Sequence, residues 1–360
     1  MRHFWWMHWL ALTTVMLSAP VIAETGPRLL EVRNDAVWKH RASGLSFSRV
    51  VAGLPRTKLT DFSDAEWDVA ATYQTPDGAE TMTVYVYQAA TQSASLWFAE
   101  AQKPIVSRVD SYGKIAPLAP ATTFAPRGDP VASALRIAYN ADGPWRSTAL
   151  AIAPVGTEWI VKVRFSAKTL TAAELDARLS AALADFDWPK RAVRHAPARV
   201  VVDCVKTLPT LQDAKLVPDN TAAAIFGGLM GSIRSDPKVA GKNGEAPLYC
   251  RDAQLSSGLT VYRPDSDTER YLISLGDSGR AVIVEQDTLR ALLDKADGAD
   301  KPNVFSITLV MPGRILTFPS VDRLPPPSQA MAIADGGKWL SETKRDGKNS
   351  AITVNADTLK

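Results

Sequence analysis

The stretch "TMTVYVY", residues 81–87, alternates apolar and polar side chains along its length. Met82, Val84 and Val86 share one side of an extended chain, whereas the threonine and the tyrosines between and after them share the other. Successive side chains of a strand point to opposite faces of a sheet. The pattern therefore predicts a β-strand with one face in a hydrophobic core.

Segments on both sides of this strand carry the same signature. Residues 68–73 precede it across "QTPDGAE", whose proline, aspartate and glycine are turn residues, so the two segments predict a hairpin. Further runs, also separated by turn residues, lie at 135–139, 147–153 and 159–165. Together they predict an antiparallel sheet.

Two helices interrupt these strands. Thr171 and Glu174 have the spacing of a capping box, and apolar residues then recur on one helical face until Trp188 and Pro189. A second helix is predicted over 93–102, where the following Pro104 should break or kink it. The order of strands, helix, strands and helix indicates an α+β domain, a mainly antiparallel sheet with packed helices.

The first 23 residues have the features of a signal peptide. Arg2 precedes an apolar stretch over 4–17, and small residues stand where a signal peptidase cuts, after Ala23. The alternative is an uncleaved anchor over 4–22, which its polar residues and its proline weaken. The sequence therefore predicts a periplasmic protein without a stable transmembrane segment after cleavage.

The remaining chain divides at a proline-containing basic segment. We predict a signal peptide at 1–23, an N-terminal α+β domain at 24–188, a linker at 189–199, a C-terminal α+β domain at 200–343 and a polar tail at 344–360. In the second domain we expect a short strand at Cys204, further strands after Cys250, a helix over 288–295, and "LPPPSQ" ending the sheet.

Charge and cysteines restrict the function. The 41 basic and 38 acidic residues leave the chain close to neutral, so nothing electrostatic favours nucleic acid. Cys204 and Cys250 are the two cysteines, and in an exported chain they predict one disulfide. A metal or redox role has no support, because the two thiols lack a Cys-x-x-Cys spacing.

The opening of the N-terminal domain carries a resemblance. Trp38, His40, Ser43 and Gly44 form a Trp-x-His-x-x-Ser-Gly pattern, which is similar to the opening of uncharacterised exported proteobacterial proteins. The order of strands and helices over residues 36–190 also resembles a Mog1/PsbP-like sandwich. The resemblance implies a fold and no particular activity.

The sequence "GDSG" places Ser278 among the residues that surround the nucleophile of trypsin-like proteases. Such a serine needs a histidine base. After the predicted cleavage the chain has His40, in the other domain, and His195, in the linker. The flanking runs "YLISL" and "AVIVE" are rich in β-formers, so we predict that Ser278 belongs to a hairpin turn.

Metal and cofactor motifs are incomplete. Asp64, Glu66 and Asp68 have the first three spacings of a calcium loop, but Val69 occupies the position that needs glycine. The acidic run 265–269 fails in the same way. We therefore predict no metal site and no cofactor.

A glycine-rich apolar segment covers residues 222–233. Gly227, Gly228 and Gly231 fit neither a dinucleotide loop nor a Walker loop, but on a helix they would give a nearly flat side. That side could be an interaction surface, membrane-touching or self-associating, or could pack on the protein's own sheet.

These observations favour a non-catalytic periplasmic protein of two domains that binds a partner protein or another envelope component. The alternative is a secreted hydrolase that acts on glycan or ester bonds with paired carboxylates, drawn from Asp61, Asp64, Glu66 and Asp68. The identity of the partner is not encoded in any motif.

Overall fold

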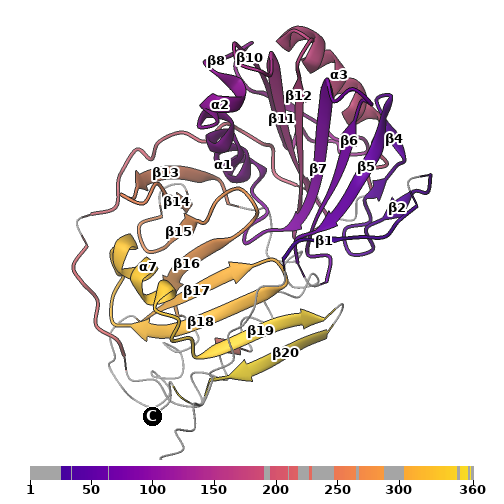
Figure 1. Cartoon of the computed structure of the whole chain (residues 1–360). Coiled ribbons are helices and arrows are strands. Elements are labelled where there is room, and N and C mark those ends of the chain that lie inside the picture. The colour runs from indigo at the N-terminus through magenta and orange to yellow at the C-terminus, as the bar shows by residue number, and fades with distance from the viewer. Residues whose placement is uncertain are drawn as a thin grey trace, which may run out of the picture.

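A computed structural model describes residues 26–33, 35–63, 65–189, 195–209, 211–217, 227–228, 247–264, 267–287, 304–346, 349–355 and 357. In these residues antiparallel sheets predominate and helices are few. Figure 1 shows one large sheet in the N-terminal half and another in the C-terminal half. The predicted signal peptide and the helix predicted over 288–295 lie outside the described residues.

The first large sheet belongs to the N-terminal half. Its strands are β1 (Arg28–Leu29), β4 (Val50–Val51), β5 (Leu54–Asp61), β6 (Asp68–Gln74), β7 (Glu80–Gln88), β8 (Ile115–Pro117), β9 (Thr122–Phe124), β10 (Ala134–Ala141), β11 (Ser147–Val155) and β12 (Trp159–Ala167). The main path runs β1-β5-β6-β7-β12-β11-β10-β8, and a separate small pair joins β2 (Trp38–Lys39) to β3 (Ser46–Phe47).

The alternating stretch forms the middle of this sheet, as predicted. Met82, Val84 and Val86 on β7 are at most 1% exposed, and β7 pairs with β6 on one side and with β12 on the other. Helix α3 (Ala172–Asp185) begins at the predicted capping box and packs Leu175 and Leu179 into the same core. Both local predictions are confirmed.

The other face of the sheet carries helix α1 (Ala94–Val106), which is followed by the short α2 (Val109–Tyr112). Ser93 caps α1 through its hydroxyl, which accepts from the backbone N–H of Leu96. Of the predicted break or kink at Pro104, the break is wrong, because the helix continues through this residue to its end at Val106. Pro104 stands in the last turn, so only two helical residues have to continue past it.

The second large sheet is a meander whose strands pair in sequence order. It contains β13 (Tyr249–Gln254), β14 (Thr260–Pro264), β15 (Tyr271–Ser274), β16 (Ala281–Gln286), β17 (Phe305–Met311), β18 (Arg314–Val321), β19 (Ser341–Asp346) and β20 (Asn349–Val354). Helix α7 (Pro327–Asp335) connects β18 to β19 and contributes Ala330 and Ala334 to the core beneath.

The end of the chain differs from the prediction. The "LPPPSQ" segment leads into α7 instead of ending the sheet, and the predicted polar tail at 344–360 contains most of the β19–β20 hairpin. The inward positions of β19 are Ser341, Thr343 and Arg345, which are buried although they are polar. The strand therefore lacks the apolar alternation by which β7 is recognised.

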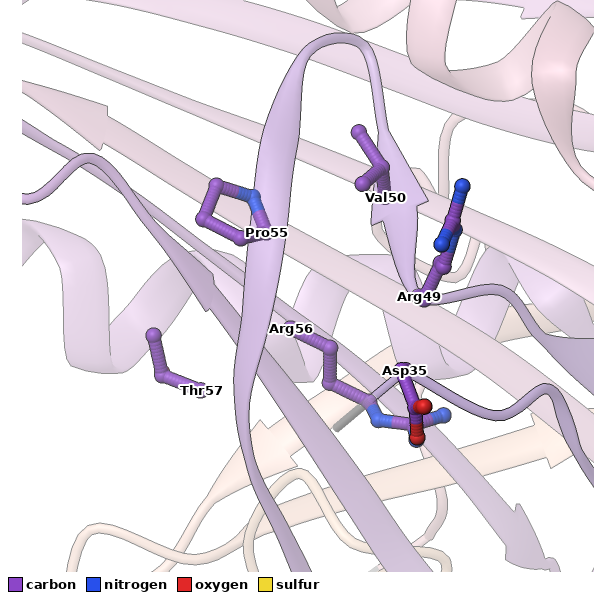
Figure 2. A pocket seen from close by; sticks show the side chains of 6 residues that line it. All are labelled: Asp35, Arg49, Val50, Pro55, Arg56 and Thr57. Atoms are coloured by element: carbon purple, nitrogen blue, oxygen red, sulfur yellow. The ribbon is translucent and has the colours of Figure 1, made fainter. Parts of the chain in front are cut away.

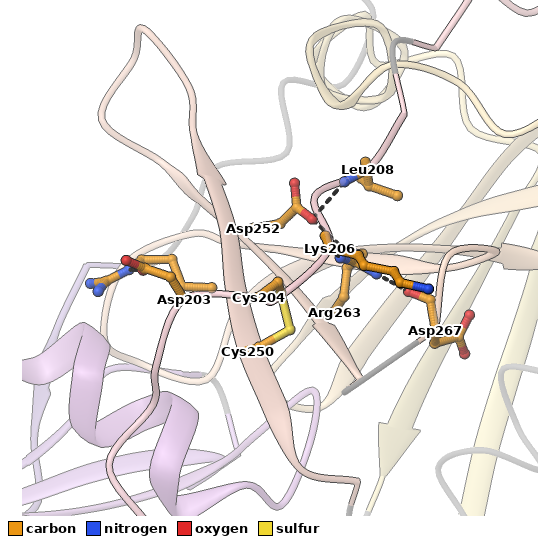
Figure 3. The surroundings of a disulfide bond; sticks show 9 residues. Asp203, Cys204, Lys206, Leu208, Cys250, Asp252, Arg263 and Asp267 are labelled. Carbon is orange, nitrogen blue, oxygen red and sulfur yellow. Dashed lines mark hydrogen bonds and ion pairs between the residues drawn. A yellow bond between two sulfur atoms is a disulfide. The ribbon is translucent and has the colours of Figure 1, made fainter.

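The predicted disulfide between Cys204 and Cys250 is present, with 4.9 Å between the two Cα atoms. Beside it, the buried Arg263 pairs with Asp252 at 2.5 Å and also donates to the backbone carbonyl of Lys206 (Figure 3). The disulfide and the arginine thus attach the segment that precedes the second sheet to β13 and β14.

The two halves share a hydrophobic cluster. Tyr87 and Trp97 from the first half pack in one group with Tyr262, Leu272 and others from the second. The hydroxyl of Tyr262 donates to the carboxylate of Glu100 at 2.5 Å inside this contact. The sheets are therefore joined through buried side chains as well as through the chain itself.

The described part of the predicted linker, residues 195–199, packs against the first half. His195 is 5% exposed, and its Nε2 lies 2.8 Å from the carbonyl oxygen of Gly156. The N–H of Ala198 donates to the carbonyl of Ala132 at 2.9 Å. This part of the connector is held by specific contacts.

Candidate functional site

A shallow pocket of about 500 Å³ lies beside the β4–β5 hairpin (Figure 2). Asp35, Arg49 and Arg56 contribute its charges. The guanidinium of Arg56 is committed to the backbone, because it donates to the carbonyls of Phe47 and Ala36, both at 2.7 Å. This arginine supports the fold of the N-terminal loops and is not available to a ligand.

A larger cleft of about 870 Å³ lies between the two halves. Strands β6, β7 and β12 form one wall, and the other wall comes from the β15–β16 turn, the β17–β18 turn and β19. Six cationic side chains line the cleft: Arg108, Lys162, Arg164, Arg280, Arg314 and Lys344. Three carboxylates line it as well: Asp68, Asp277 and Glu342.

Pairing between β7 and β12 positions the central lysine. Lys162 lies directly opposite Tyr85, and its ammonium is 4.5 Å from the centre of the tyrosine ring. Arg164 follows two residues later, and so it points from the same face of the sheet. The side chain of Lys162 is only 5% exposed, so its charge needs a partner in the protein.

The turn that contains Ser278 provides that partner. It connects β15 to β16 as the predicted hairpin, and it inserts against the first half, where the N–H of Ala90 donates to the carbonyl of Gly279 at 2.8 Å. Lys162 Nζ donates to the backbone carbonyl of Asp277 and pairs with its carboxylate, both at 2.9 Å. The Gly-Asp-Ser-Gly turn therefore forms part of one wall of the cleft.

Ser278 lines this cleft, and the described chain places neither of its two histidines there. His40 and His195 are not among the lining residues, and within the described chain no hydrogen bond joins Ser278 to Lys162. Burial lowers the pKa of Lys162, and the ion pair with Asp277 opposes that lowering, so the ammonium is held on Asp277 and not on the serine.

We expect that a fluorophosphonate probe does not label the protein, because neither histidine of the described chain lies with Ser278 in the cleft to activate it. Mass spectrometry of the probe-treated protein is the check. Labelling of the wild type that Ser278→Ala abolishes would contradict the interpretation as a turn residue.

The Trp-x-His-x-x-Ser opening supports the loop that leads into the cleft. His40 is 1% exposed, and its Nε2 lies 2.7 Å from the carbonyl oxygen of Glu66. A carbonyl can only accept, so Nε2 carries the proton and Nδ1 accepts from the hydroxyl of Ser43, also at 2.7 Å. Burial lowers the pKa of His40, which keeps the ring neutral. The contact fixes Glu66, a non-glycine residue with a φ of 61°, two positions before Asp68.

The carboxylates of the hydrolase alternative do not form one pair. Asp61 is fully buried, accepts from the N–H and the hydroxyl of Ser63 at 2.9 and 2.8 Å, and pairs with Arg28. Asp64 lies outside the described residues. Neither Asp61 nor Glu66 lines the cleft, whereas Asp68 does.

Asp68 is the unusual group in the cleft. It is 6% exposed, and among the hydrogen bonds and ion pairs between described residues it takes part only through its backbone, whose N–H donates to the hydroxyl of Ser63. Burial raises its pKa to about 6, although the charges of Lys162 and Arg280 oppose that rise. Burial acts in the same direction on Asp277, but Lys162 and Arg164 outweigh it and hold the pKa of Asp277 below its ordinary value.

The raised pKa of Asp68 makes stability depend on pH. The folded pKa of about 6 exceeds the unfolded value of 3.8, so the native state binds more protons between them and stability falls as pH rises through that window. We expect the free energy of unfolding of the wild type to fall by roughly 2–3 kcal/mol between pH 4 and pH 7 because of this group. Asp68→Asn should not show this fall. Urea unfolding of both proteins at several pH values measures it, and parallel pH profiles would contradict the assignment.

The glycine-rich segment contacts the second sheet where it is described. A Cβ on Gly227 would lie 2.9 Å from Thr317, and one on Gly228 would lie 2.3 Å from Ile352. The hydroxyl of Thr343 donates to the carbonyl of Gly228 at 2.9 Å. This side of the two glycines faces the protein's own sheet. Gly231 lies outside the described residues, and an interaction surface at this segment stays a prediction.

Comparison of the chain with protein-family models, with curated proteins and with solved structures finds no match. Among the helices that the structure describes, none combines the length and the apolar character needed to cross a membrane.

Proposed function

We propose that this chain is a non-catalytic binding protein of the periplasm that takes a small anionic ligand in the cleft between its two halves. The observation that supports this proposal most directly is the charge of the cleft, which is lined by six cationic side chains and three carboxylates. A cleft with an excess of one charge concentrates ligands of the opposite charge, since its walls exclude water and focus the field.

Shape and location support this proposal. Ligand sites are commonly concave, lie between domains, and have volumes of roughly 300–1,000 Å³. The cleft of about 870 Å³ lies in that range. The disulfide is consistent with export, and we propose a cleaved signal peptide, a periplasmic location and two α+β domains on this basis. The likeness of residues 36–190 to a Mog1/PsbP-like sandwich stays a prediction.

Calorimetric titration with citrate, a small polyanion, tests the proposal. We expect citrate to bind at low salt and to bind more weakly as salt is added. Arg108 and Lys344 are exposed, so replacing both with glutamine should leave the fold intact and weaken binding about threefold to tenfold. The charge-matched control replaces Lys39 and Lys338, which are exposed but do not line the cleft.

Two outcomes would contradict anion binding in this cleft. One is the absence of citrate binding at low salt. The other is an equal loss of affinity in the cleft variant and in the control variant, since this would mean that only the overall charge of the protein matters.

One observation favours the hydrolase as a second candidate. Asp68 and Asp277 line the same cleft, and their pKa values move in opposite directions, as is typical of an acid and a base that act together. The pairing of Asp277 with Lys162 favours binding, because a carboxylate held by an ammonium is a weaker base. Release of p-nitrophenol from glycoside or ester substrates, abolished by Asp68→Asn, would favour hydrolysis.

A further inference from the structure

A simple anion does not account for Asp68. This carboxylate is nine-tenths buried in the wall of a cleft whose other side chains are mainly cationic. A buried carboxylate repels an anionic ligand and costs free energy when no donor satisfies it. A ligand that brings a hydrogen-bond donor to this position removes that cost.

We propose that the ligand is a sugar acid, a ring that carries several hydroxyl groups and one carboxylate. In this arrangement a ring hydroxyl donates to Asp68 while the carboxylate lies among the cationic side chains of the cleft. The inference rests on the proposed function, because it specifies the chemistry of the anion that the cleft binds.

The surroundings of Asp68 favour a neutral donor over a charged one. Lys162 and Arg280 act on Asp68 through their charges, and both line the same cleft. An ammonium group on the ligand would meet these two cations as well as the carboxylate, and like charges at close range are unfavourable. A hydroxyl group donates one hydrogen bond and adds no charge.

Two of the cationic donors in the cleft are committed elsewhere. Lys162 donates to the backbone carbonyl of Asp277 and forms an ion pair with its carboxylate. Arg314 pairs with Glu342 at 2.5 Å, which neutralises the charge of both on the opposite wall. Among the interactions between described residues, none brings a donor to the carboxylate of Asp68, and a bound ligand can supply one.

The dimensions of the cleft fit a ligand of this size. Its volume of about 870 Å³ exceeds what a single small ion such as phosphate needs. Phe62 is 39% exposed at its margin and offers an apolar surface to the carbon-bound hydrogens of a sugar ring. One ring, or two rings joined together, can occupy this space.

Three related compounds separate the two parts of the recognition. Glucuronate has a carboxylate and hydroxyls, cyclohexanecarboxylate has only the carboxylate, and glucose has only the hydroxyls. We expect calorimetry of the wild-type chain at about pH 7.5, where Asp68 is ionised, to show glucuronate binding at least tenfold more tightly than either of the others. In Asp68→Asn the preference for glucuronate over cyclohexanecarboxylate should fall to about threefold or less, because a neutral amide accepts a weaker hydrogen bond.

The outcomes distinguish this inference from the function on which it rests. Citrate binding together with equal affinity for glucuronate and cyclohexanecarboxylate would overturn hydroxyl recognition and leave anion binding intact. An undiminished preference for glucuronate in Asp68→Asn would also overturn it. Failure of citrate and of all three compounds to bind would overturn both. The wild-type series decides the matter even if the variant does not fold.

Discussion

Replacement of Gly279 with alanine is expected to destabilise the protein by about 2–4 kcal/mol, from backbone strain and from a steric clash. The residue has a φ of +83°, and an added Cβ would lie 2.6 Å from the carbonyl oxygen of Gln88 and 2.8 Å from the ring of Tyr87. Both neighbours belong to the first half, whereas Gly279 belongs to the second. The methyl group would therefore separate the turn from the wall that it contacts.

Gly276 provides a matched control in the same turn. Its φ is +84°, but no atom lies within 4 Å of an added Cβ. Gly276→Ala should therefore cost only the backbone strain, about 1–2 kcal/mol. Urea unfolding of the two variants measures the difference. Equal losses would show that the turn does not pack against the first half in solution.

Removal of the disulfide should have an effect of similar size. The bond closes a loop with a sequence separation of 46 residues. The chain-entropy relation gives about 4 kcal/mol for such a loop, and native strain or residual structure commonly reduces it, so we expect roughly 2–4 kcal/mol for the variant with both cysteines replaced by alanine. The loss should appear in the second half, since the first half contains no cysteine.

Denaturant unfolding with and without a thiol reductant checks this prediction. Reductant should destabilise the wild type to about the level of the double variant and should leave that variant unchanged. Two titratable thiols in the native protein would contradict the disulfide. A loss of under 0.5 kcal/mol would show that Arg263, through its contacts with Asp252 and Lys206, holds the segment without it.

The predictable parts of the fold are those with a local apolar signature. The alternation around Val84 and the capping box at Thr171 depend only on neighbours within a few residues, and both elements form where expected. The sequence does not predict strand β19, because its buried positions hold Thr343 and Arg345, whose hydrogen-bond partners lie far away in the chain. A run of polar residues predicts a solvent-exposed segment when those distant partners are unknown.

The cleft could be predicted only in fragments. The β-rich runs on both sides of Ser278 predict its turn, whereas the sequence marks Asp68 only as one of several acidic residues. Lys162 gave no signal, since one lysine inside a strand commonly points to solvent. Its importance depends on the pairing of β12 with β7 and on the insertion of a hairpin that follows over a hundred residues later. Tertiary proximity of this kind has no local pattern.

The contrast between the two sheets has a consequence for the order of folding. Each strand of the second sheet pairs with its neighbours in sequence, whereas β7 must find β12 across the intervening helices and strands. Local pairing closes short loops and is rapid, while distant pairing is slower. We expect the meander to form early and to expose Tyr262 and Leu272, which are buried in the cluster shared with the first half, until the first sheet closes. A chaperone that recognises apolar side chains would find its target on this transient surface, and aggregation during refolding should increase with protein concentration in that interval.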